Sequence, residues 1–194
     1  MADLGPERPE HRAGLLPGVV AFYAVMALGA WGLAAAFDVD LRAVTLGGPE
    51  ALPAPLAAVA GAASGLLLVL LSRPLLHTRA MAAFRDEVRA ALGRPGPVAV
   101  GVLAAASALG EELLFRGTLH ALIGLWPTVL IFGLLHGGGV PRLLGWTLFA
   151  LGAGVGLGLL ATWSGSLLAP IVMHFTVNHF NITALTASGS EARP

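Results

Sequence analysis

Six long apolar runs, separated by short segments rich in Pro, Gly and Arg, constrain this sequence of 194 residues more than any other feature. Hydrophobic residues make up 56% of the chain and charged residues 11%, and the mean hydropathy is +0.81. A run of about 20 apolar residues can cross a bilayer as a helix, because a helix satisfies its own backbone polar groups in lipid. We therefore expect an all-α, polytopic transmembrane helical bundle. The expected spans are residues 16–37, 54–72, 98–120, 126–138, 143–161 and 167–186.

Residues 73–97 lie between two of these runs and are too charged to cross a membrane. Met81, Phe84, Val88 and Leu92 recur there at spacings of three and four residues, which places them on one face of a helix. We predict an amphipathic helix on the cytoplasmic surface of the membrane. A plain solvated linker helix is the alternative.

The arginines indicate how the chain is oriented in the membrane. If the N-terminus is inside, nine arginines lie on the inner side and at most two, Arg42 and Arg116, on the outer side. Cytoplasmic loops of membrane proteins are enriched in basic residues. We therefore predict an integral protein of a bacterial inner membrane with both termini in the cytoplasm. The nine inner arginines are Arg8, Arg12, Arg73, Arg79, Arg85, Arg89, Arg94, Arg142 and Arg193.

The stretch ALGEELLFRG, residues 108–117, places ionisable groups inside an apolar run. Each such group costs about 2.5 to 3.5 kcal/mol at bilayer depth, so paired or functional residues are expected there. Glu112 and Arg116 are four residues apart and share a helix face, so they can neutralise each other. Glu111 points about 100° away from Glu112 and is left to contact another group.

Two further apolar runs in the second half of the chain carry polar side chains. His136 lies in one run, and His174 and Asn178 lie four residues apart on one face of the other. Together with Glu111, these groups can activate a water and stabilise an oxyanion, or they can ligate a divalent metal. Helical rise places Glu111, His136 and His174 at one depth in the outer half of the bilayer. This depth predicts access from the extracytoplasmic side or laterally from lipid.

Three motifs with the patterns EExxxR, FxxxH and HxxxN occur in this order, and together they resemble the CPBP intramembrane proteases. That family contains the CAAX prenyl endopeptidases, bacteriocin-processing or immunity-associated proteins, and sorting-type proteases such as the myxosortases. The resemblance covers about residues 98–185. The matching residues are Glu111, Glu112, Arg116, Phe132, His136, His174 and Asn178.

The resemblance implies a glutamate-dependent endopeptidase that hydrolyses a peptide bond of a membrane-associated or membrane-anchored protein or peptide. By similarity, Glu111 is the general base that deprotonates a water, and His136 assists in positioning or activating that water. His174 and Asn178 bind the oxyanion of the tetrahedral intermediate.

The other motif residues are expected to support the site. Glu112 and Arg116 would form a structural ion pair, and Phe132 would pack beneath the reacting groups. The family has also been described as metalloproteases, and a zinc ion would then be held by Glu111, His136 and His174. We favour the mechanism without a cofactor and keep zinc as the alternative.

We expect one membrane domain over residues 1–194. It would comprise tails at 1–15 and 188–194, two spans without diagnostic residues in 16–72, the amphipathic segment, and a catalytic core in 98–187. The expected partners are the substrate and the lipid bilayer, and no nucleic acid. A catalytically silent immunity or interaction protein with the same fold, and a transporter with a polar cavity, are the alternative functions.

Overall fold

The computed structural model describes residues 15–187, and every regular element in this range is helical. The all-α prediction is therefore confirmed for these residues. The tails predicted at both ends, with Arg8, Arg12 and Arg193, lie outside the described residues. The α-helices are α2 (Leu15–Ala36), α3 (Leu41–Leu46), α4 (Ala54–Leu76), α5 (Ala82–Leu92), α6 (Pro97–Glu112), α7 (His120–Ile123), α8 (Leu125–Leu135), α9 (Leu144–Ser164) and α10 (Leu168–Ala187). A π-helix, η2 (Leu113–Leu119), joins α6 to α7, and short 3₁₀ turns, η1 (Arg79–Met81) and η3 (Pro141–Leu143), precede α5 and α9.

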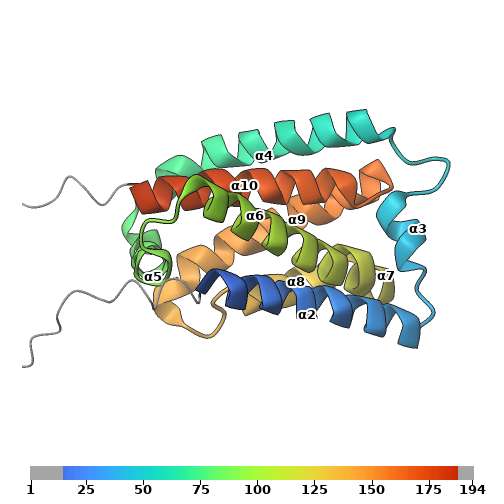
Figure 1. The fold of residues 1–194 in the computed structure, drawn as a ribbon, viewed down its shortest axis with the longest axis horizontal. Helices are drawn as coiled ribbons and strands as arrows, with labels where there is room; N and C mark the ends of the chain where they lie inside the picture. Colours follow the sequence, from blue (N-terminus) through green and yellow to red (C-terminus); the bar gives the residue numbers. More distant parts are fainter. Residues whose placement is uncertain (1–14, 188–194) are drawn as a thin grey trace, which may run out of the picture.

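The long helices run side by side as a bundle, with α3 at one end and α5 at the other (Figure 1). Helix α10 packs along α4, α6 and α9, while α6 also packs against α2. Two glycines of α4, Gly61 and Gly65, allow this close packing, because a side chain at either position would collide with α10. The polar residues of α10 are thereby placed between neighbouring helices.

Four helical segments in the described residues are long and apolar enough to cross a membrane: 16–36, 54–76, 97–123 and 141–164. Helix α8 has 11 residues, so it is about 16 Å long and shorter than the roughly 30 Å hydrocarbon core. Helix α10 has 20 residues, but its polar side chains keep it out of this group. Four of the six expected spans are therefore both long enough and apolar enough to cross a membrane.

The fourth expected span, residues 126–138, is shorter in the structure than predicted. Helix α8 begins after Gly124, which has a φ of 81°, and ends at Leu135. Gly137 and Gly139 also have positive φ, 109° and 85°, a conformation that a right-handed helix cannot include. His136 therefore lies at the end of α8 rather than inside a helix.

The predicted amphipathic helix is present as α5, with its apolar side against the end of the bundle. Phe84 stacks on Trp146 of α9 with ring centroids 3.8 Å apart, and Val88 packs against a cluster that includes Leu185. The guanidinium of Arg85 donates to the Leu76 carbonyl at 2.6 Å. These contacts attach α5 to the ends of α4, α9 and α10.

Candidate active site

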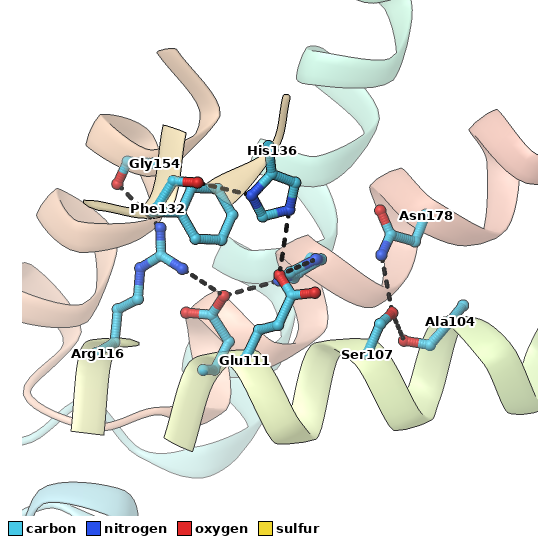
Figure 2. A network of polar contacts seen from close by, with 10 residues as sticks. Ala104, Ser107, Glu111, Arg116, Phe132, His136, Gly154 and Asn178 are labelled. Carbon is cyan, nitrogen blue, oxygen red and sulfur yellow. Dashed lines mark hydrogen bonds and ion pairs between the residues drawn. The ribbon is translucent and has the colours of Figure 1, made fainter. Parts of the chain in front are cut away.

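The two glutamates occupy the last turn of α6, and Arg116 lies in the π-helical turn that follows. Arg116 Nη1 donates to Glu112 Oε1 at 3.0 Å, so the predicted ion pair is present. Arg116 Nη2 donates to the Gly154 carbonyl of α9 at 3.2 Å, and the guanidinium lies over the Phe132 ring, 4.3 Å from its centroid (Figure 2). The arginine is therefore held from three sides.

His174 lies between the two glutamates. Its Nδ1 is 2.7 Å from Glu112 Oε1, the same oxygen that accepts from Arg116. Its Nε2 is 3.8 Å from Glu111 Oε2. A carboxylate can only accept, so Nδ1 is the donor toward Glu112 and Nε2 is directed toward Glu111. Glu112 thus orients the imidazole, as carboxylates commonly orient functional histidines.

His136 reaches Glu111 from the end of α8. Its Nδ1 lies 2.7 Å from the carbonyl of Phe132, which can only accept, so this nitrogen is the donor. Its Nε2 then faces Glu111 Oε2 at 3.6 Å, beyond a direct hydrogen bond (Figure 2). Two imidazole Nε2 atoms therefore face one carboxylate oxygen. That oxygen is buried and has no hydrogen-bond partner among the described residues.

Asn178 has a separate hydrogen-bond chain beside this cluster. Its Nδ2 donates to Ser107 Oγ at 2.9 Å, and Ser107 Oγ donates to the Ala104 carbonyl at 3.1 Å (Figure 2). Ser107 lies one helical turn before Glu111, so both side chains are on the same face of α6. The amide of Asn178 has two N–H groups, and Ser107 orients it through one of them.

A cavity of about 250 Å³ joins these groups, and Glu111, His136, His174 and Asn178 all line it. The rest of its wall is mainly apolar. Apolar lining residues from α5, the first turn of α9 and the last turns of α10 include Phe84, Val88, Leu92, Trp146, Ile182 and Leu185. The cavity therefore extends from the carboxylate toward the α5 end of the bundle.

The depth of Glu111 and the direction of the cavity bear on the predicted side of access. Glu111 is about 21 Å along the helix from Pro97 and about 18 Å from Ile123, so it lies near the middle of that span, closer to the Ile123 end. The cavity reaches toward α5, whereas the arginine count and the helical rise predict access from the extracytoplasmic side or laterally from lipid. The direction of the cavity depends on the docking of α5 through tertiary contacts, which the spacing of polar residues does not show.

In the structure, the motif residues lie close together around one shared cavity. Sequence reasoning missed three contributors: Tyr23, Ser107 and the carbonyl of Gly154. Ser107 could have been found, because it is a polar residue four positions before Glu111 on one helix face. Tyr23 is the only tyrosine of the chain and lies in an otherwise apolar run.

The zinc alternative concerns the three side chains that meet at Glu111. Glu111 faces His136 and His174, but in residues 15–187 no group of three or more His, Asp or Glu is arranged to hold a metal ion. We therefore assign no step of the chemistry to a metal.

The fold and the site define a class: a helical membrane protein with a buried Glu–His–Arg cluster beside an apolar cavity. Residues 94–180 match the family model described as Rce1-like, the type II CAAX prenyl endopeptidases. The match covers slightly less than half of the chain, confirms the resemblance carried by the motifs, and supports an intramembrane endopeptidase in general. Together with the four apolar helices, it indicates an integral membrane protein.

Among curated proteins, the uncharacterized protein YpbD of Bacillus subtilis (strain 168) is 41% identical over 73 residues. That alignment spans 37% of this chain and 37% of YpbD. No solved structure matches the chain.

Proposed function

We propose that this chain is an intramembrane endopeptidase in which Glu111 activates a water for attack on a peptide bond. The observation that carries the proposal is the position of Glu111 Oε2. This oxygen is buried, has no hydrogen-bond partner among the described residues, and faces the Nε2 atoms of His136 and His174 beside the cavity. A general base needs an acceptor atom of this kind within reach of the water it deprotonates.

The proposed reaction is a hydrolysis in two stages. Glu111 Oε2 takes one proton of the water while the water oxygen bonds to the scissile carbonyl carbon, and His136 Nε2 holds the water in line. The resulting oxyanion accepts hydrogen bonds from the second N–H of Asn178 and from His174 when its Nε2 carries a proton. The C–N bond then breaks, and the proton on Glu111 passes to the leaving nitrogen. The products are a carboxylate terminus and an amine.

The substrate proposed is a membrane-associated or membrane-anchored protein or peptide, because the cavity wall is mostly apolar and lies among membrane helices. The test is purified protein in liposomes with a farnesylated CAAX peptide, alongside mass spectrometry of protein C-termini in cells with wild-type protein or Glu111→Gln. Cleavage products that require Glu111 support the proposal. If neither assay yields a product that depends on Glu111, the chain is a silent member of the fold or a transporter.

We also propose that the reaction needs no metal. Purified wild-type protein treated with 1,10-phenanthroline is expected to keep its cleavage rate, and elemental analysis is expected to find no stoichiometric zinc. Loss of activity that zinc restores would establish the metal-dependent alternative, with Glu111 as one of the ligands.

The α5 end of the bundle is proposed to face the cytoplasm. Six arginines lie at this end, in or beside α5 and the α8–α9 connection, whereas the α3 end has one arginine, Arg42, among the described residues. The six are Arg73, Arg79, Arg85, Arg89, Arg94 and Arg142. Substrate would then enter the cavity from the cytoplasmic side or laterally from lipid.

Labelling of single cysteines tests this orientation, because the chain has no cysteine of its own. Thr78 at the α5 end and Glu50 at the α3 end are both exposed. In intact cells, a membrane-impermeant thiol reagent that reaches the outer face is expected to modify Glu50→Cys and to spare Thr78→Cys. The opposite pattern would invert the orientation and place the cavity on the outer side.

A further inference from the structure

Helix α2 meets α6 immediately beside Glu111. A side chain at Gly110 would place its Cβ 2.9 Å from the Tyr23 carbonyl oxygen and 3.1 Å from the Tyr23 Cβ. Glycine at position 110 therefore allows the two helices to approach closely at this one level. The contact brings the only tyrosine of the chain next to the residue proposed as the general base.

The side chain of Tyr23 lines the same cavity as Glu111. The shared cavity places the Tyr23 phenol where it interacts electrostatically with the Glu111 carboxylate. In a hydrogen bond between these two groups the phenol is the donor, because a carboxylate can only accept. The neighbouring Phe22 is 58% exposed on the outside of the bundle, so α2 presents one ring to the surroundings and one to the cavity.

The orientation of the Glu111 carboxylate needs a further group to fix it. The two histidines lie 3.6 and 3.8 Å from Oε2, too far to fix the carboxylate by direct hydrogen bonds. Glutamate has three side-chain torsions, so an unrestrained carboxylate would sample several orientations. A donor fixed on another helix restricts these orientations and still leaves an oxygen facing the histidines.

We propose that Tyr23 is a positioning residue that holds the Glu111 carboxylate in its orientation toward His136 and His174. Its effect on catalysis rests on the function proposed above, while the contact itself does not. The first helix, which the motifs leave without a role, thereby becomes part of the site.

The contact can be tested without a substrate, because a single tyrosine gives a single signal. Protein labelled with 13C at the phenol carbon of tyrosine is reconstituted in nanodiscs and observed by NMR. The signal is expected to shift in Glu111→Gln and to stay in place in Glu50→Gln, a control in the loop between α3 and α4. An unchanged signal in Glu111→Gln would overturn the proposal, whatever the activity.

The consequence for catalysis is tested with Tyr23→Phe, which keeps the ring that packs against Gly110 and removes only the hydroxyl. A lost hydrogen bond to a charged group predicts a fall in kcat of about 10- to 100-fold, with KM unchanged. The exposed neighbour variant Phe22→Leu is expected to retain wild-type kcat. Wild-type kcat in Tyr23→Phe would refute the positioning role. If the wild-type protein cleaves nothing, the proposed function fails and the NMR signal still decides the contact.

Discussion

The polar cluster has two sides that use the same residue types differently. On the closed side, Glu112 and Arg116 have side chains that are 0% and 1% exposed, and each makes direct hydrogen bonds. On the open side, Glu111 and His136 are 8% and 21% exposed, lie beside the cavity, and face each other at 3.6 Å. His174 belongs to both sides, through Nδ1 and Nε2 respectively.

This difference shows how two adjacent glutamates come to lie in different surroundings. Successive residues of a helix point about 100° apart. In α6 this rotation directs Glu112 toward Arg116 and Glu111 toward the cavity. On the closed side, the charges of Glu112 and Arg116 stabilise each other, and Glu112 holds His174 in place. On the open side, Glu111 Oε2 has no hydrogen-bond partner among the described residues, and in the proposed reaction it accepts a proton from water.

The largest expected effect is on the open side. Glu111→Gln keeps the size and shape of the side chain and removes the base, so cleavage is expected to fall by about 10²- to 10⁴-fold. The thermal midpoint of unfolding should stay close to that of the wild type, because Glu111 has no direct salt partner within hydrogen-bond distance. Cleavage rates in liposomes and melting in detergent measure the two quantities. A variant that keeps most of its activity would remove Glu111 from the mechanism.

On the closed side, the expected effect is on stability. Glu112→Ala leaves Arg116 buried without its partner, which typically costs about 3 to 5 kcal/mol. A Glu112→Gln, Arg116→Gln double variant is expected to recover part of this loss. Reversible unfolding in mixed detergent micelles gives the free energies.

The chain offers a matched control for the buried pair. Glu87 and Arg142 also form an ion pair, at 2.8 Å, but their side chains are 44% and 70% exposed. Glu87→Ala is therefore expected to cost less than about 1 kcal/mol. Equal losses for Glu112→Ala and Glu87→Ala would mean that the closed side is not a desolvated pair.

Local spacing predicted the parts of this site that depend on one helix. The pairing of Glu112 with Arg116 follows from a four-residue separation, and it survives the π-helical turn between them. Spacing could not place His136 at a helix end, because that depends on positive φ at Gly137 and Gly139. The spacing of charged residues does not single out Tyr23, since a tyrosine in an apolar run is usually a packing residue.

The direction of the cavity depends on contacts between helices, which the spacing of apolar residues along one helix does not predict. The apolar spacing of α5 predicted a helix with one apolar face, which is correct, but did not show what that face would contact. The stack of Phe84 on Trp146 joins residues far apart in the sequence and sets the cavity wall at that end. Such pairings arise from the packing of the whole bundle, so the direction of the cavity could be read only from the structure.

The smallest expected effect lies at the edge of the open side, where Ser107 holds Asn178. Ser107→Ala removes the acceptor for one N–H of the Asn178 amide. The amide remains, so only its orientation is lost, at about 1 kcal/mol for one neutral hydrogen bond or roughly a fivefold fall in kcat. Asn178→Ala should cost more, about 10²- to 10³-fold, because it removes the proposed oxyanion donor itself.

A second Ser–Asn pair between helices separates orientation of the oxyanion donor from general packing. Ser72 of α4 donates to the carbonyl of Val69 and lies 3.4 Å from the side-chain oxygen of Asn181 on α10. Both serines are buried, so Ser72→Ala and Ser107→Ala remove the same group from similar surroundings. Steady-state kinetics should show a lower kcat only for Ser107→Ala, with KM unchanged. Equal kcat values in the two variants would mean that Ser107 contributes packing alone, and the open side would then consist of Glu111, its histidines and an unassisted Asn178.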